Sequence, residues 1–338
     1  MAQINKPSEY FNTKLYTGNA STQSITGVGF QPDWVWIKNR SITADHKEFD
    51  AVRGVTNALI TNSTAAEFSQ SGLDSFDSDG FTVGSHVGCN GNGNSIVAWN
   101  WLGANGTASN TDGSITSTVS ANTTSGFSIV SYTGTGSSMS VGHGLSQKPD
   151  IVIFKNRDAV VNWGVYTDLI DGSYDFLYLN ETNAKGDSGS YSASANTFSF
   201  SASSTVANTS GEKVIGYCFH SVKGFSKMGT YTGNGSTDGT FVYTGFKPAF
   251  VICKITSSAN SWTIQDNTRN INNPVSNYLL ADDSGAEGTA GLNLDFVSNG
   301  FKARTTSGAV NDPGASYIYM AFAESPLVGT NNIPATAR

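Results

Sequence analysis

The chain has 338 residues, a formal net charge of −7 and charged side chains at only 13% of its positions. This composition argues against a nucleic-acid binder, which needs a basic surface to displace counterions from phosphates. It also argues against disorder and long helices, because 19 Phe, 13 Tyr and 6 Trp accompany 37 Gly and only 8 Pro, and helix formers are sparse. We therefore expect an all-β protein whose aromatic strands are joined by small polar turns.

The N-terminus and the cysteines indicate the compartment. Residues 1–7 lack the basic and apolar pattern of a signal peptide, and no apolar run approaches the ~20 residues of a membrane span. We expect a soluble chain made in a cytoplasm, without membrane contact. Cys89, Cys218 and Cys253 show no CxxC spacing, so they predict reduced structural thiols and no zinc site.

The first predicted elements return twice along the chain. Tyr16-Thr17-Gly18 has counterparts at 132–134 and 231–233. Each copy precedes an apolar strand that ends in a lysine, and these lysines are Lys38, Lys155 and Lys254. An aspartate follows each lysine by 12 or 13 residues, and these are Asp50, Asp168 and Asp266. An internal repeat is therefore the main organising feature of the sequence.

Each copy closes in the same way. A hairpin signal comes at 79–81, 196–198 and 299–301, and an alternating strand follows at 96–101, 214–219 and 317–322. Units of about 95 residues with many short strands are the size of a β-sandwich. We predict three tandem jelly-roll or concanavalin-like sandwiches: unit 1 (10–103), unit 2 (126–222) and unit 3 (224–325). Residues 104–125 are expected to form a linker or surface loop, and residues 326–338 a C-terminal tail.

The repeated lysines and aspartates are interpreted as structural markers. A lysine at the end of an apolar strand usually brings its ammonium to solvent over a neighbouring ring. Its other expected role is an ion pair with the aspartate of its own unit, which would hold the sandwich together.

The tryptophans are the candidate glycan-facing aromatics. Trp34, Trp36, Trp99 and Trp101 alternate along two strands. Aromatic residues in this pattern form a core more often than a sugar platform, so the core interpretation is favoured.

Metal and catalytic patterns are weak. Asp74, Asp77 and Asp79 resemble part of a calcium loop, but the distal glutamate is missing and Asp79-Gly80 already predicts a turn. The four histidines share no repeat position and are expected at the surface or in turns. Neither a Glu-x-Asp-x-x-Glu glycosidase pattern nor a Gly-x-Ser-x-Gly elbow occurs. We expect no enzyme activity and no cofactor.

Several motifs of unit 1 resemble a repeated domain of uncharacterised virion proteins of tailed phages, especially marine ones. The matching stretches are 10–19, 27–38, 49–54, 76–81 and 97–101, and the match is weaker in unit 2 at 166–172. The resemblance implies a concanavalin-like or jelly-roll sandwich without an established catalytic site. It also implies a virion component made in the bacterial host cytoplasm.

The leading hypothesis is therefore a non-enzymatic virion structural protein that docks on other capsid or tail proteins. It would be exposed as a capsid decoration, head fibre or tail appendage. The alternative is a carbohydrate-binding adhesin or tail-fibre receptor-binding protein whose partner is a host-surface glycan. A depolymerase is the third class, and it would need two carboxylates facing each other in a groove.

Overall fold

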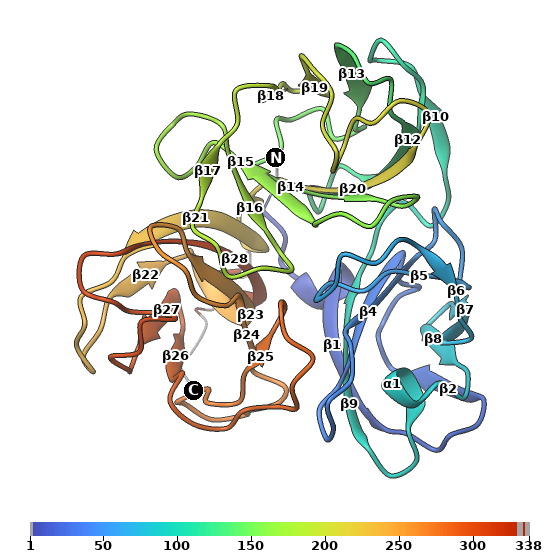
Figure 1. The fold of residues 1–338 in the computed structure, drawn as a ribbon. Helices are drawn as coiled ribbons and strands as arrows, with labels where there is room; N and C mark the ends of the chain where they lie inside the picture. The colour runs from blue at the N-terminus through green and yellow to red at the C-terminus, as the bar shows by residue number, and fades with distance from the viewer. Residues whose placement is uncertain (1–2, 330–333, 335–338) are drawn as a thin grey trace.

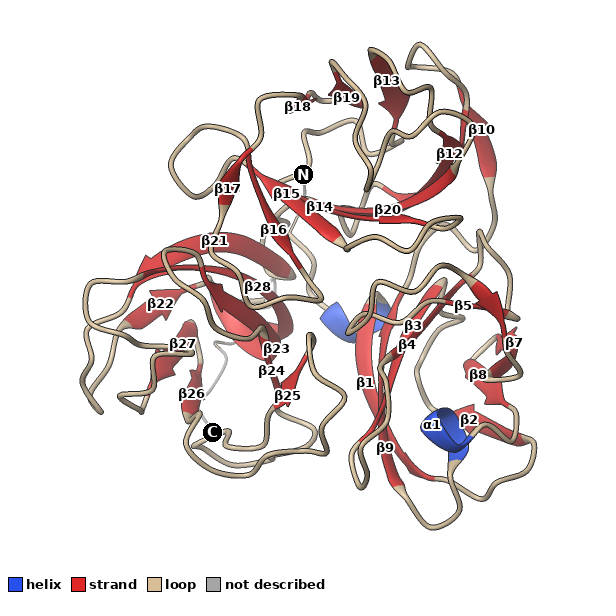
Figure 2. Ribbon diagram, viewed as in Figure 1, coloured by secondary structure: helices blue, strands red, loops and turns tan. Residues whose placement is uncertain are grey.

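Strands form nearly all the regular structure of the computed structural model, which describes residues 3–329 and 334 (Figure 1, Figure 2). The two helices among these residues, η1 (Pro7–Glu9) and α1 (Val87–Asn90), are each about one turn long. No helix in the described part of the chain is long and apolar enough to cross a membrane. The expected all-β class is confirmed.

Unit 1 contains a four-stranded and a three-stranded antiparallel sheet. The larger sheet has the order β1-β9-β3-β4, formed by β1 (Phe11–Thr17), β9 (Ser95–Trp101), β3 (Trp34–Asn39) and β4 (Lys47–Asp50). The smaller has the order β2-β8-β7, formed by β2 (Gln23–Thr26), β8 (Gly80–Val83) and β7 (Leu73–Asp77). A further short pair joins β5 (Asn57–Ala58) to β6 (Phe68–Ser69).

Unit 2 belongs to an eight-stranded sheet of order β10-β11-β12-β20-β14-β15-β16-β17. Its strands are β10 (Ala108–Asn110), β11 (Ser117–Asn122), β12 (Phe127–Thr133), β20 (Lys213–Phe219), β14 (Ile151–Asn156), β15 (Gly164–Thr167), β16 (Asp175–Tyr178) and β17 (Gly186–Asp187). The smaller sheet has the order β13-β19-β18, formed by β13 (Met139–Gly142), β19 (Thr197–Phe200) and β18 (Tyr191–Ala193).

Unit 3 has a five-stranded and a three-stranded sheet. The larger has the order β21-β28-β23-β24-β25, formed by β21 (Ser226–Thr232), β28 (Ser316–Pro326), β23 (Phe246–Ile255), β24 (Thr263–Asp266) and β25 (Leu279–Leu280). The smaller has the order β22-β27-β26, formed by β22 (Phe241–Tyr243), β27 (Gly300–Ala303) and β26 (Leu294–Val297).

One strand order therefore appears in three successive parts of the chain. β1-β9-β3-β4 corresponds to β12-β20-β14-β15 and to β21-β28-β23-β24. In each small sheet, the phenylalanine after the hairpin turn lies opposite an aliphatic residue: Phe81 opposite Ile25, Phe198 opposite Val141, and Phe301 opposite Val242. These pairs fix which positions of the three units are equivalent. The division into three separate sandwich domains with the boundaries given above stays a prediction.

The three units share a central core. Each pair of sheets encloses its own apolar cluster, and a fourth cluster connects the three large sheets. This central core includes Trp34, Trp99, Phe127, Tyr217, Phe250 and Met320. In Figure 1 the units appear as three lobes around this region, coloured blue to cyan, green to yellow, and orange to red. The large sheets are therefore covered on both faces, and every residue of β3 and β14 is buried.

The segment expected to be a linker or loop is partly strand. Within 104–125, β10 and β11 extend the large sheet of unit 2, with Val119 of β11 opposite Val130 of β12. Val119 and the half-buried Ala121 pack on the apolar cluster of unit 2, which explains why this Ser- and Thr-rich stretch becomes ordered.

The predicted tail is described only in part. β28 continues to Pro326, and the Gln3 side chain donates a hydrogen bond of 2.6 Å to the Val328 carbonyl oxygen. Residues 330–333 and 335–338 of the predicted tail lie outside the described residues.

Candidate functional site

The four candidate glycan-facing tryptophans lie in the central core. Each is at most 2% exposed, and Trp34 stacks on Trp101 at 4.3 Å and on Tyr217 of unit 2 at 4.5 Å between ring centroids. The core interpretation of their alternation is correct and the glycan-facing assignment is wrong. The face of the sheet that carries them meets the other two units instead of solvent.

A buried ionic network crosses the contact between units 1 and 2, which we call the 1–2 junction. Asp50 accepts hydrogen bonds from Arg53 and, at 2.8 Å, from the hydroxyl of Tyr217. Arg53 also contacts Glu67 at 3.0 Å, and Glu67 contacts Arg157 of unit 2 at 2.7 Å. Although burial opposes ionisation of Glu67, hydrogen bonds from Arg157 and the charge of Arg53 lower the pKa of this carboxyl.

The contact between units 3 and 1, the 3–1 junction, repeats the network. Asp266 accepts from Arg269 at 2.5 Å and from the indole N–H of Trp99 in unit 1 at 3.1 Å. Arg269 contacts Glu287 at 3.0 Å, and Glu287 contacts Arg40 of unit 1 at 2.7 Å. Because Asp50 lies opposite Trp34 and Asp266 lies opposite Phe250, which are equivalent positions, the two networks are equivalent.

The contact between units 2 and 3, the 2–3 junction, lacks this network. Thr167 lies opposite Ile151 at the position of Asp50, and Ile170 takes the place of Arg53. Met320 pairs with Ile252 as Tyr217 pairs with Ile153. Both Ile170 and Met320 pack in the central core. Apolar packing therefore replaces ion pairing at this junction.

A main-chain hydrogen bond joins the two units at each of the three junctions. The Glu67 N–H donates to the Arg157 carbonyl at 2.8 Å, and the Glu287 N–H donates to the Arg40 carbonyl at 3.0 Å. At the 2–3 junction the Lys185 N–H donates to the Thr256 carbonyl at 2.9 Å. Lysine and threonine thus occupy the places of glutamate and arginine.

The assignment of Asp168 as a repeat marker is wrong. Pairing of β14 with β15 puts Thr167 in the marker position, and Asp168 follows it. Asp168 forms an ion pair with the exposed Lys148 and takes no part in a junction network. Asp50 and Asp266 are brought into the core as the repeat implies, but each binds an arginine three residues later instead of the strand-end lysine.

The strand-end lysines do not reach solvent, so their expected position is also wrong. Lys38, Lys155 and Lys254 are 0% exposed. Their ammonium groups donate to main-chain carbonyl oxygens, including Asn39 for Lys38 at 2.9 Å and Asn156 for Lys155 at 2.9 Å. Two of them cross junctions, because Lys38 also donates to Ser284 of unit 3 and Lys155 to Thr64 of unit 1. Burial lowers the pKa of each lysine to about 8.

A further buried ionisable group faces the central core. Glu48 lies opposite Trp36, and Val165 and Ile264 occupy the equivalent positions. Burial raises the pKa of Glu48 to about 8, so its carboxyl is largely neutral at pH 7. A perturbed carboxyl often marks a catalytic site, but this one is 0% exposed.

The histidines differ from their expected surface positions. His46, His143 and His220 are at most 3% exposed, and only His86 is half-buried. The Nδ1 atom of His46 accepts a hydrogen bond of 2.8 Å from the indole of Trp36. Burial lowers the pKa of His143 to about 4.

The calcium-like aspartates do not converge. Asp79 accepts from the N–H groups of Gly27 and Gly29, whereas Asp77 accepts from two hydroxyl groups of its own hairpin. Among the described residues, the candidate metal-binding group is instead formed by Asp171, Asp175 and Asp187.

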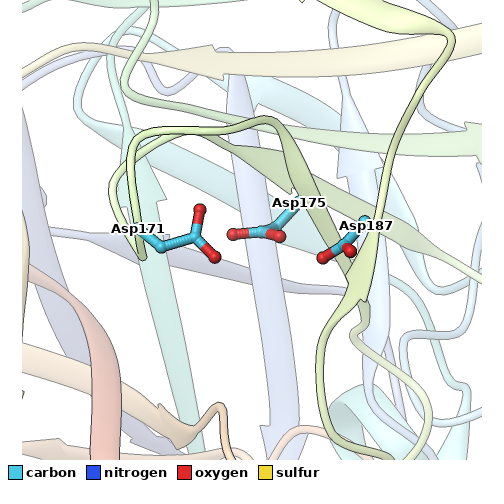
Figure 3. Close-up of side chains that lie close together, drawn as sticks. All are labelled: Asp171, Asp175 and Asp187. Atoms are coloured by element: carbon cyan, nitrogen blue, oxygen red, sulfur yellow. The ribbon is translucent and has the colours of Figure 1, made fainter.

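This acidic group already holds a cation of the chain. Figure 3 shows the three carboxylates directed toward one another from the loop after β15 and from β16 and β17. The Lys185 ammonium donates to Asp171 at 2.7 Å, Asp175 at 2.7 Å and Asp187 at 3.0 Å. These hydrogen bonds raise the pKa of Lys185, and its ammonium takes the place that a metal ion would need.

Sequence reasoning missed the exposed aromatic residues. Phe241 and Tyr243 of β22 are 45% and 59% exposed. Ser24 and Thr26 occupy the equivalent positions of unit 1, and Ser140 and Gly142 those of unit 2. Aligning the three hairpins around Phe81, Phe198 and Phe301 could have identified this difference.

Three antiparallel sheet systems around one aromatic core define an all-β protein whose main charged clusters are internally paired. The chain belongs to the family described as Domain of unknown function (DUF7483), whose model matches residues 6–326. The match includes all three units, so the family domain comprises the whole arrangement around the central core. A comparison with curated proteins finds no match.

Proposed function

We propose that the chain is a non-enzymatic structural protein of a tailed-phage particle and acts by docking on other virion proteins. The observation that carries this proposal is the central core shared by the three large sheets. A shared core holds three outward surfaces in a fixed relation, which a protein that spans neighbouring subunits of an assembly requires. The phage context rests on the sequence resemblance of unit 1.

The outward surfaces suit docking without strong charge. Because the large sheets face one another, the small sheets β2-β8-β7 and β13-β19-β18 lie on the outside of their units. Their outer positions carry small polar residues such as Ser24, Thr26 and Ser140. Small side chains let main chains approach closely, and they lose little conformational entropy when an interface forms.

The arrangement also favours an exposed position on the particle. Three units related by a common strand order around one core are compatible with a local threefold or pseudo-threefold position. Capsid decoration, head fibre and tail appendage all provide such positions. The protein would be made in the host cytoplasm and added during particle assembly.

Cryo-electron microscopy of purified particles from the source of this sequence tests the proposal. We expect density for the chain on the outer surface of the head or tail, in contact with another virion protein. Particles that contain no copy of the chain by mass spectrometry would contradict the structural role. A chain found only at strict twofold or sixfold positions would contradict the threefold part.

A carbohydrate-binding adhesin is the second candidate function. The observation that favours it is the exposure of Phe241 and Tyr243 on unit 3 alone.

A further inference from the structure

The outer edge of unit 3 carries a groove that is bordered by aromatic residues. The groove has a volume of about 410 Å³, within the ~300–1,000 Å³ usual for small-ligand sites. β21 and β22 line it, together with Leu169 of unit 2 and Tyr319 of β28. Phe241 and Tyr243 project on the same side of β22, because residues two apart on a strand share a face. Both side chains are about half exposed.

Unit 3 differs from the other two units at this edge. Gly229 of β21 occupies the position of Lys14 in β1 and Val130 in β12. A side chain at Gly229 would come within 2.9 Å of the Tyr319 hydroxyl, so the glycine leaves room for the Tyr319 ring to reach the groove. Units 1 and 2 have the same strand order without aromatic residues at the positions of Phe241 and Tyr243. The scaffold of unit 3 therefore does not require them.

Polar groups suitable for hydroxyl recognition accompany the rings. Lys227 and Thr230 line the groove, and both side chains are exposed. Burial raises the pKa of Tyr319 to about 12, so its hydroxyl stays a hydrogen-bond donor at neutral pH. The groove thus combines flat apolar surfaces with donors and acceptors.

A fixed ionic cluster adjoins the rings on the outer face of the small sheet. Lys302, opposite Phe241 in the register, contacts Asp238 at 2.6 Å, and Arg304 contacts Asp238 at 3.0 Å and Asp295 at 3.2 Å. Thr82 and Ser199 occupy the position of Lys302 in units 1 and 2. Asp238 is 77% exposed, so its carboxylate can accept further hydrogen bonds.

The size of the apolar surface decides between a glycan and a protein partner. Aromatic side chains bury about 150–250 Å² each, so two rings about half exposed offer roughly 200 Å². A stable protein interface needs about 800 Å² per partner. Two rings beside fixed polar groups instead match one or two pyranose units, whose C–H faces lie on aromatic planes while their hydroxyls meet charged and polar side chains.

We propose that this groove is an oligosaccharide-binding site, formed by Phe241 and Tyr243 with Lys227, Thr230 and the Asp238 cluster. The rings that define the site belong to unit 3, because units 1 and 2 carry small residues at the equivalent positions. The inference rests on the second candidate function and names its site; it is independent of the assembly role, which would stand if no glycan bound.

A glycan array printed with neutral and acidic bacterial surface oligosaccharides tests the site with the full chain. We expect binding that falls at least tenfold in the double variant Phe241→Ser/Tyr243→Thr, which reproduces the residues of unit 1. The matched control is Val160→Ser, which removes an apolar side chain that is 72% exposed on unit 2. This control should bind like the unchanged chain. All three proteins should share one melting temperature, because the altered side chains are exposed.

Two results would overturn the proposal. One is absence of binding on the array, and the other is binding that the double variant retains. Adsorption to whole host cells separates a glycan from a protein ligand. We expect periodate oxidation of the cell-surface glycans to abolish adsorption; adsorption that survives periodate and is lost in the double variant would assign the groove to a protein partner.

Discussion

The three junctions of the molecule occupy equivalent places but use different chemistry. At the 1–2 and 3–1 junctions, an aspartate and an arginine are buried together. The aspartate accepts a hydrogen bond from an aromatic side chain of the next unit. At the 2–3 junction, Thr167, Ile170 and Met320 occupy the same places. The residues at all three positions differ together between the two kinds of junction, so the groups of each junction are matched to one another. Buried charge is acceptable in such a core only when all of its partners are present.

The comparison also explains Lys185. Glu67 and Glu287 each connect a core arginine to an arginine of the neighbouring unit. At the 2–3 junction neither arginine is present, and a lysine, Lys185, stands in the place of the glutamate. It binds Asp171, Asp175 and Asp187 of its own unit instead. The acidic group is thus best understood as the counterpart of a junction network, with the signs of charge reversed.

The largest expected effect comes from breaking one ionic junction. Arg53→Met leaves Asp50 as a buried charge without its partner, which costs about 3–5 kcal/mol of unfolding free energy. The matched control is Ile170→Met at the equivalent position of unit 2, where a volume-conserving exchange costs less than about 1.5 kcal/mol. Urea denaturation monitored by tryptophan fluorescence measures both. Equal losses of unfolding free energy for the two variants would show that the ionic and the apolar junction do not differ in their sensitivity to substitution.

Converting the ionic junction to the apolar one should cost less than breaking it. The triple variant Asp50→Thr/Arg53→Ile/Tyr217→Phe removes both charges and the hydroxyl that bound them. We expect a loss below about 2 kcal/mol, because no buried charge is left without a counter-ion: Glu67 loses Arg53 but keeps its ion pair with Arg157. The same denaturation experiment checks it, and a triple variant less stable than Arg53→Met would refute the complementarity of these residues.

The buried lysines predict a rise in stability with pH. Their pKa is about 8 in the folded chain, below that of an unfolded lysine, so the unfolded chain binds more protons above pH 8. Unfolding free energy should therefore increase between pH 8 and 9, by up to about 1 kcal/mol per lysine. Part of this rise is offset in the same pH range. Burial raises the pKa of Cys89 and Cys218 to about 12, so only the unfolded thiols ionise near their ordinary pKa of about 8.5, and Glu48, with a pKa of about 8, still binds protons only in the folded chain.

Lys155→Met tests this assignment, since no carboxylate contributes to the lowered pKa of Lys155. We expect the rise between pH 8 and 9 to shrink by up to about 1 kcal/mol, which is the contribution of one such lysine. Denaturation at half-unit pH steps measures the slope. An unchanged slope would place the ammonium of Lys155 in contact with water.

The smallest effect concerns the acidic group at the 2–3 junction. The melting temperature of the unchanged chain should be the same in calcium and in EDTA, because the Lys185 ammonium already contacts Asp171, Asp175 and Asp187 and occupies the position between them. In Lys185→Met the three carboxylates repel one another, and we expect a loss of about 1 kcal/mol that calcium restores. Thermal melts in the two buffers measure this. Stabilisation of the unchanged chain by calcium would contradict the role given to Lys185.

Local signals in the sequence predicted the strands well. Asp79-Gly80 and Asn299-Gly300 mark real hairpins, and the alternating runs at 96–101, 214–219 and 317–322 form β9, β20 and β28. These features depend on residues near one another in the chain. For the same reason, all-β structure could be predicted without knowledge of tertiary contacts.

The alternation predicted that Trp34 is buried, but the unit that it meets and the positions of Lys38 and Asp168 could not be predicted in this way. Alternation along a strand separates two faces, but it does not reveal that the second face meets another unit. The spacing of 13 residues between Lys155 and Asp168, against 12 in the other two units, shows a one-residue offset, but the pairing of β14 with β15 is needed to put Thr167 in the marker position. The partners Glu67 and Arg157 lie 90 residues apart, and no local pattern connects them.

Native-state hydrogen exchange measured by mass spectrometry tests most directly whether the three units form one body around the central core. The amides of β9, β20 and β28 should exchange through a common opening with the same free energy, because each strand contributes side chains to that core. Exchange of β28 at a clearly lower free energy than β9 and β20 would show that unit 3 opens independently, and would contradict the shared core.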